Sequence, residues 1–337
     1  MLKFKKLAVM LVAMTVITTS TISLNKVQAF AKTEEIVTYS SIESVDSRFN
    51  KMKVVANGKF IEDPHNNNNT LFLSTDGSFI KSGLEQGGAY YFASMYWPSA
   101  YKCTIEIEDD GKLDGKAKIV SSLPKNTIKT SKVDNVMGYS AGGTIGMEGN
   151  KPVGSINGSV NVSQSISYDQ PNFNTINTNS SSHKASWDVR FSGTDECYDR
   201  DSKNITYGNQ MFMKSRLNNT GDKNLTSFDK LPTLVSGGFS PDFLVALSAP
   251  KDKKQSIVSI NFKKQLDHYT LEWSGFNWFG YNFYNNTISS TYKFLIDWQK
   301  HTIKVLGEGK HVYDTRPIIP NEAIEYTDEN GNVSAIL

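Results

Sequence analysis

The most constraining feature of the sequence is a long segment, residues 133–166, in which apolar and polar side chains alternate. Up to position 147 the odd positions are mostly apolar, and the even positions are mostly small or polar. After the turn formers and strand breakers at 149–152, the alternation resumes with the even positions apolar. A period of two is typical of β-strands, so the segment predicts a long hairpin with one apolar and one polar face.

Each arm of this hairpin is longer than the about 9–11 residues that a tilted strand needs to cross a bilayer. A single hairpin leaves backbone groups unpaired at its edges, and each such group costs several kcal/mol in hydrocarbon. Several copies must therefore close a ring before they insert. We expect the lipid-facing side to carry Met137, Tyr139, Ala141, Ile145, Met147, Ile156, Val160, Val162 and Ile166. We expect the pore lumen to be lined by Asp134, Ser140, Thr144, Glu148, Ser155, Asn157, Ser159, Asn161 and Ser163.

A soluble sheet with one face on a core would show the same alternation, because half-buried antiparallel strands are common. The composition favours the transmembrane interpretation, since Gly and Ser are poor strand formers and add little to a soluble sheet. Repeated rings of Asp134 and Glu148 would attract cations, while Lys151 at the turn would oppose them. We therefore expect a mildly cation-selective pore.

The N-terminus has the pattern of a secretory signal peptide. Lysines at positions 3, 5 and 6 precede an apolar run from 7 to 22, and small residues follow near Ala29. We expect cleavage after Ala29 or Ala31, which removes residues 1–29, and we expect the mature chain to be secreted. No later segment is long and apolar enough to be a transmembrane helix.

The charge of the chain argues against a polyanionic partner. The formal net charge is +2, and the segment to be removed carries four lysines and no acid, so the mature chain falls to −2. A surface of that charge does not favour nucleic acid or a purely electrostatic attachment to membranes.

Frequent turn signals without helical periodicity predict a mainly β fold, a β-sandwich. The expected strands include 51–61, 70–79, 187–191, 257–262, 269–273 and 292–298, with an exposed loop at 63–69. Residues 30–50 are expected to be a flexible N-terminal arm and 51–305 the main domain. Residues 306–337 are a C-terminal extension that either adds a strand or stays mobile. Cys103 and Cys197 form no framework pattern, so we expect free thiols, although a disulfide remains open.

Several motifs occur in a fixed order along the chain. They are Trp97-Pro98-Ser99-Ala100-Tyr101, Tyr168 with Gln170-Pro171-Asn172-Phe173, Tyr198-Asp199-Arg200-Asp201, the run from Tyr207 to Arg216, the run from Ser236 to Phe243, and Ile296-Asp297-Trp298. Together they resemble the hemolysin/leukocidin family of β-barrel pore-forming toxins. The segments at 60–65 and 123–128 are most similar to the branch of the clostridial beta toxin and the necrotic enteritis toxin.

The resemblance implies a secreted monomer with a β-sandwich cap, a rim that touches lipid, and a folded prestem at 133–166. Binding to a host membrane lipid or receptor would be followed by homo-oligomerisation, usually into a heptamer, and by insertion of a transmembrane β-barrel. The expected function is a cytolytic pore-forming toxin.

The rim departs from the family pattern at one point. The family pairs a Trp shortly before the Tyr-Asp-Arg-Asp motif with the Arg that ends Met-Lys-Ser-Arg, and together they hold a choline headgroup. Arg216 is present, but residues 193–197 contain no Trp, and a cation–π cage needs that ring. We therefore expect a different receptor. The expected membrane or receptor contacts of the rim are Arg216 and the aromatic residues Phe276, Phe279, Tyr281 and Tyr284, since aromatic side chains favour the bilayer interface.

Two other classes of function are open to a secreted chain of this kind. The histidines are scattered and none has the H-E-x-x-H spacing of a zinc hydrolase, so we expect no catalytic residue, metal or cofactor. A β-sandwich adhesin or lectin would explain secretion and exposed aromatic residues, but not a hairpin whose alternation reverses at a turn.

Overall fold

The computed structural model describes residues 35–47, 50–108, 116–149, 160–193, 203–307, 310–314, 318, 324–327 and 333–336. The expected signal peptide and Cys197 lie outside the described residues. Cys103 is a free, buried thiol, and burial raises its pKa. The expectation of a free thiol is confirmed for this cysteine.

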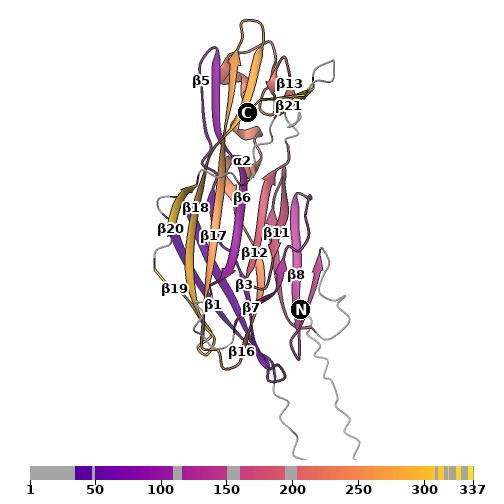
Figure 1. Ribbon diagram of the computed structural model, residues 1–337, viewed down its shortest axis with the longest axis vertical. Helices are drawn as coiled ribbons and strands as arrows, with labels where there is room; N and C mark the ends of the chain where they lie inside the picture. The colour runs from indigo at the N-terminus through magenta and orange to yellow at the C-terminus, as the bar shows by residue number, and fades with distance from the viewer. Residues whose placement is uncertain are drawn as a thin grey trace, which may run out of the picture. The chain divides into compact units, whose positions relative to one another are not determined.

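A seven-stranded sheet forms one layer of a sandwich (Figure 1). Its order is β15-β4-β2-β3-β16-β7, with β1 on β2. The bounds are β1 (Val37–Ser47), β2 (Met52–Glu62), β3 (Asn68–Ser74), β4 (Phe79–Lys81), β7 (Lys118–Leu123), β15 (Gly238–Phe239) and β16 (Leu244–Pro250). Strand β1 pairs antiparallel with β2 from Val37↔Glu62 to Ser47↔Met52. The expected flexible arm is therefore wrong for residues 37–47, because backbone pairing to a neighbouring edge orders a strand without apolar periodicity.

A ten-stranded sheet forms the other layer, in the order β11-β12-β6-β17-β18-β14-β13. Strand β5 pairs with β6, and both β19 and β20 pair with β18. The bounds are β5 (Glu85–Gly88), β6 (Phe92–Ile107), β11 (Phe173–Ser180), β12 (Lys184–Phe191), β13 (Lys203–Asn204), β14 (Gly208–Asn209), β17 (Gln255–Trp273), β18 (Trp278–Asp297), β19 (Thr302–Val305) and β20 (Lys310–Asp314). The strands expected at 257–262 and 269–273 are one strand, because a bulge near Leu266 carries β17 across the polar residues between them.

The two sheets enclose one aromatic-rich core, and we call the sandwich that they form the cap. The ring of Trp187 on β12 stacks on Phe243 with centroids 4.7 Å apart, and Tyr101 on β6 lies 5.3 Å from Phe239. Because Phe239 and Phe243 belong to the seven-stranded side, these contacts join the layers. The mainly β sandwich expected from the sequence is confirmed.

Short helices connect β14 to β15. They are α1 (Gly221–Asn224), the 3-10 helix η2 (Phe228–Lys230) and α2 (Thr233–Ser236). None of the helices in the described part of the chain has the length and hydropathy needed to cross a membrane.

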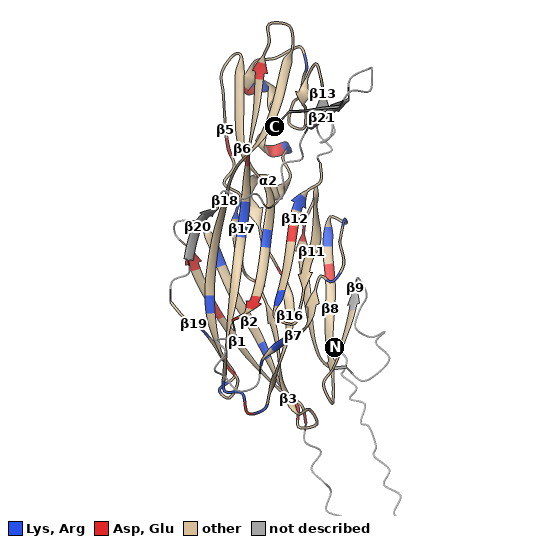
Figure 2. Cartoon of the chain, viewed as in Figure 1, with Lys and Arg blue, Asp and Glu red and all other residues tan. Residues whose placement is uncertain are grey.

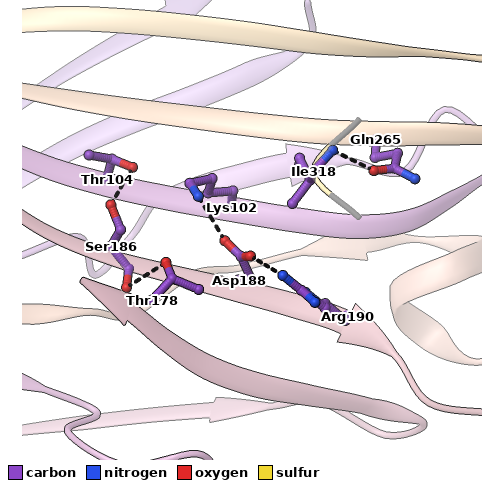
Figure 3. A network of polar contacts seen from close by, with 8 residues as sticks. All are labelled: Lys102, Thr104, Thr178, Ser186, Asp188, Arg190, Gln265 and Ile318. Atoms are coloured by element: carbon purple, nitrogen blue, oxygen red, sulfur yellow. Dashed lines mark hydrogen bonds and ion pairs between the residues drawn. The ribbon is translucent and has the colours of Figure 1, made fainter. Parts of the chain in front are cut away.

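The C-terminal extension adds a strand to the cap. Strand β20 pairs antiparallel with residues 287–291 of β18. Farther on, the backbone N–H of Ile318 donates to Oε1 of Gln265 on β17 at 2.7 Å (Figure 3). Of the two possibilities for 306–337, the added strand is confirmed for 310–314. Strands β21 (Ile324–Thr327) and β22 (Val333–Ile336) pair with each other.

The same face of the ten-stranded sheet carries a compact ion-pair cluster on β6 and β12. Asp188 is buried between Lys102 at 3.0 Å and Arg190 at 2.7 Å (Figure 3). Its neighbours in sequence, Trp187 and Val189, point into the core, so Asp188 faces the opposite side. A carboxylate buried there is stabilised because each of its oxygens lies within ion-pair distance of a cation.

Candidate functional site

The alternating segment forms a separate three-stranded sheet in the order β10-β8-β9. The strands are β8 (Lys132–Ser140), β9 (Thr144–Gly149) and β10 (Val160–Asp169). Strand β8 turns directly into β9 through Gly142 and Gly143, whose φ values of 85° and 92° suit glycine. The single straight arm expected up to position 147 is therefore wrong for this structure, since that arm is folded in half. Residues 150–159 lie outside the described part.

The expected lipid-facing residues pack against the cap instead. Met137, Tyr139 and Ile166 are buried, and Ile145, Met147 and Val162 pack around them. The surface that they cover is formed by Ile61, Phe72, Leu123, Leu244 and Ala246 of the seven-stranded sheet. The cap therefore covers the apolar face of the docked hairpin and shields it from water. Ala141 is exposed at the turn, and Ile156 and the side chain of Val160 lie outside the described residues.

The expected lumen residues lie on the opposite, wetter face. Thr144, Asn161 and Ser163 are exposed, and Asp134 and Ser140 are half-buried. Ser155, Asn157, Ser159 and the side chain of Glu148 lie outside the described residues. Strand β8 carries charge only at its start, at Lys132 and Asp134 (Figure 2). The face division predicted from alternation is thus present in the folded sheet, where described.

A buried carboxylate holds the tip of β8 on the cap. Oδ2 of Asp63 accepts hydrogen bonds from the Tyr139 hydroxyl and from the Gly142 backbone N–H, both at 2.8 Å. Oδ1 accepts the His65 N–H at 2.8 Å, and the Asn66 amide donates to the Tyr139 oxygen at 3.1 Å. Burial raises the pKa of Asp63, but the hydrogen bonds outweigh burial and lower the pKa. Asp63 is therefore charged at neutral pH, which strengthens the contact.

Tyr139→Phe is expected to loosen the hairpin. The substitution removes one hydrogen bond to a charged group, worth about 1.5–3 kcal/mol, while Asp63 keeps its two backbone donors. Hydrogen exchange of β8 and β9 amides should become faster by at least about tenfold. Tyr39→Phe is the matched control, because Tyr39 donates to Glu62 at an exposed position on β1. Equal protection in the two variants would show that Asp63 does not secure the hairpin.

Both ends of the hairpin are anchored in the cap. Val133 and Tyr168 belong to the main core. The side-chain amide of Gln170 donates to the carbonyl oxygens of Ile128 at 3.1 Å and Thr130 at 2.8 Å. These contacts hold both ends of the docked hairpin on the cap.

The expected aromatic contacts lie where β17 ends and β18 begins. Phe276 is 89% exposed in the connecting loop, Tyr281 is exposed, and Phe279 and Tyr284 are half-buried. Phe283, which belongs to the same aromatic run but was not among the expected contacts, continues the exposed row: its ring lies 5.7 Å from Tyr281, which lies 4.8 Å from Phe279. Alternation at 279, 281 and 283 is the signal that would have found it.

Two further exposed apolar side chains belong to loops that are hydrogen-bonded to the loop of Phe276, and we call Ile205, Leu217 and Phe276 the rim tip. The Asn277 amide donates to the Thr206 carbonyl at 2.5 Å, and the Trp278 N–H donates to the Arg216 carbonyl at 2.8 Å. These bonds bring the loops of Ile205, 82% exposed, and Leu217, 58% exposed, beside Phe276. Clusters of exposed apolar residues of this kind mark interaction sites. No periodicity in the sequence links the three loops.

Arg216 has a partner within its own chain. Its guanidinium carbon lies 4.6 Å from the ring centroid of Tyr207, and its Nε donates to Gln210 at 2.7 Å. Residues 194–202, with the Tyr-Asp-Arg-Asp motif, lie outside the described part. A cation stacked on a tyrosine is a different arrangement from an open cage of Trp and Arg.

Residues 138–142 have the G-x-S-x-G spacing of a hydrolase nucleophile elbow. That elbow requires a turn from a strand into a helix. Here the turn after Ser140 leads into strand β9, so the structural context of the motif is missing.

Comparisons with known proteins agree with this architecture. The family model described as "Leukocidin/Hemolysin toxin family" matches residues 57–300. Gamma-hemolysin component B from Staphylococcus aureus is 30% identical over 285 residues, covering 81% of this chain and 85% of that protein. Leucotoxin LukDv from the same species is 29% identical over 284 residues, with the same coverage.

Solved structures give the same picture. Clostridium perfringens delta-toxin superposes with a TM-score of 0.74 and 39% identity, covering 81% of this chain and 94% of that chain. The Clostridium perfringens NetB toxin in its membrane-inserted form superposes with a TM-score of 0.63 and 37% identity, covering 80% and 100%.

Proposed function

The chain belongs to the Leukocidin/Hemolysin toxin family of pore-forming toxins, and we propose that residues 133–166 are the segment that it inserts. In this proposal residues 1–29 direct secretion, the rim binds a host membrane, and copies of the chain assemble into a ring, usually seven. Each copy contributes one hairpin to a common β-barrel. No catalytic step is required.

The observation that carries the proposal is that the face assigned to lipid is the face that packs on the cap. Met137, Tyr139 and Ile166, which alternation assigns to lipid, are the residues that bury against the cap. A hairpin that leaves the cap exposes this face to water, at a cost of about 1.5–3 kcal/mol for each large side chain. Lipid supplies an equivalent apolar surrounding, so the hairpin exchanges one covered state for another.

The strand register supports the same segment. Strand β8 pairs with β10 so that Val133 lies opposite Tyr168 and Tyr139 opposite Val162. If the bulge between Val160 and Val162 is removed on extension, the register seen from Val133 to Tyr139 would place Ile145 opposite Ile156 and leave Asn150 and Lys151 as a two-residue turn. We infer that the β8–β10 pair is retained during insertion, while β9 leaves β8 and extends the arm.

The extended arms have the length of a membrane-spanning strand. From Tyr139 to Met147, and from Gly154 to Val162, the apolar face contains no charged or amide side chain. Each stretch is about nine residues, the length needed to span when tilted. Gln164 lies on this face opposite Met137, which places it at the level of the headgroups.

Dye-loaded liposomes test the function directly. The purified chain alone is expected to release dye and to produce unitary current steps in a planar bilayer. Rings of Asp134 would favour cations in those currents. Stable membrane binding without release at any protein concentration would favour the adhesin alternative.

Replacing the rim tip is expected to reduce membrane binding. Leu217→Ser with Phe276→Ser removes two exposed side chains whose burial in the interface is worth about 1.5–3 kcal/mol each, so binding should fall by at least about a hundredfold. Ile42→Ser removes an equally exposed apolar residue from β1 and is the matched control. Liposome co-sedimentation measures both. Equal losses in the two proteins would contradict the assignment of the rim.

A further inference from the structure

Asp242 lies between β15 and β16, at the base of the hairpin. Its Oδ2 accepts the backbone N–H of Ser167 on β10 at 2.9 Å. Its Oδ1 is buried and has no hydrogen-bond partner among the described residues. The side chain is 9% exposed. This carboxyl is therefore a contact between the cap and the base of the hairpin, and half of its hydrogen-bonding capacity is unused in a dry position.

Four titratable groups lie around this contact. The Asp76 carboxylate, in the turn between β3 and β4, acts on Asp242 from the cap side. From the hairpin side, Tyr168 packs against Phe239 and Phe243, and its hydroxyl bonds with that of Thr175. Asp134 on β8 accepts the Ser167 hydroxyl at 2.6 Å and is paired with Lys132. Burial and the Asp76 carboxylate both disfavour a charge on Asp242.

We propose that Asp242 is a proton-controlled catch on the hairpin: the neutral acid favours the docked hairpin, and ionisation favours its release. The inference rests on the proposed function, because it concerns the same movement of residues 133–166. It assigns a role to a cap residue outside the membrane-inserting segment.

The direction of the pH dependence follows from the environments of the Asp242 carboxyl in the docked and released states. In the docked state burial, and to a lesser extent Asp76, raise the pKa of Asp242 to about 7, while the Ser167 N–H opposes this rise. Departure of β10 admits water, and the pKa returns toward its ordinary value. The docked state then binds more protons between pH about 4 and about 7, so its advantage is present in acid and is lost as pH rises through 7.

Protonation of Asp63 would have the opposite effect on docking, but in a different pH range. Its pKa lies below the ordinary carboxyl value, so protonation would weaken that contact only in stronger acid. Between pH about 5 and 8, the response of the hairpin is therefore set by Asp242 rather than by Asp63.

Dye release measured against pH tests the catch. If ionisation of Asp242 precedes release, the wild-type rate at about pH 6 should be about a tenth of that at about pH 8. Asp242→Asn should stay at the slow, acid level throughout, since an amide cannot ionise. Asp76→Asn should move the wild-type midpoint to lower pH, because it removes a neighbouring negative charge. Asp252→Asn, at an exposed cap position, should leave the profile unchanged.

Hydrogen exchange gives a readout without membranes. Protection of β10 amides, relative to β17 amides in the same sample, should fall as pH rises in the wild type and stay constant in Asp242→Asn. If that variant does not fold, the midpoint shift in Asp76→Asn still decides. Identical pH profiles in wild type and variants would overturn the catch alone, whereas absence of dye release from wild type at every pH would overturn the proposed function.

Discussion

Ile145→Arg is expected to give a protein that binds membranes and assembles but releases no dye. In the proposed extended register Ile145 would lie opposite Ile156, two residues from the centre of the apolar stretch, so its side chain would enter the hydrocarbon close to the midplane. An arginine there costs about 2–4 kcal/mol in each copy. Because a ring multiplies this cost by the number of copies, insertion should fail entirely rather than slow down.

Thr144→Arg is the matched control, one position away on the polar face. Thr144 is exposed in the docked hairpin and would face the lumen, where a charge remains hydrated. This variant should still release dye, with single-channel currents shifted toward anions. Ala141→Arg separates insertion from folding, because Ala141 is already exposed at the turn but would face lipid in the proposed extended hairpin.

The readouts are dye release and the amount of detergent-resistant oligomer on liposomes. Ile145→Arg and Ala141→Arg should accumulate oligomers without release. Equal activity of Thr144→Arg and Ile145→Arg, whether both active or both silent, would mean that the two faces are assigned wrongly.

The sequence predicted the faces of the hairpin because alternation is a local property of the chain. The fold-back at Gly142 and Gly143 could not be predicted, since the same alternation suits a strand in lipid and a strand docked on Ile61 and Phe72. Only the competing surface of the cap decides between them.

Elsewhere the misses have similar physical origins. Strand β1 is ordered by pairing with β2, and its polar sequence does not predict this tertiary contact. Phe283 was passed over although it shares a face with Tyr281, and Ile205 joins the rim tip only through bonds between loops. Strand β20 continues the ten-stranded sheet beyond residue 300, where the family match ends.

A disulfide between the hairpin and the cap should abolish activity reversibly. The first pair of substitutions is Asn66→Cys with Gly143→Cys. A Cβ built at Gly143 lies 3.0 Å from Cγ of Asn66, close to where the sulfur of a cysteine at 66 would lie. That spacing is about the separation of a Cβ from the remote sulfur in a disulfide. The positive φ of Gly143 adds strain of about 1–3 kcal/mol, which the crosslink must hold.

The second pair, Ser121→Cys with Met147→Cys, avoids that strain. The Ser121 hydroxyl lies 2.7 Å from the Met147 sulfur, so the two side chains already meet. All variants carry Cys197→Ser, while the native Cys103 thiol is buried in the core. The single-cysteine proteins are the controls for each pair, and they should respond to oxidant as the wild type does.

Dye release from liposomes by the doubly substituted protein, oxidised and then reduced, is the most direct test of whether residues 133–166 must leave the cap. The oxidised protein is expected to bind liposomes and release no dye, and a reductant should restore release to the level of the single-cysteine controls. Release at the control level from protein shown to be fully oxidised would contradict the account, because a hairpin held at Asn66 or Ser121 cannot line a pore.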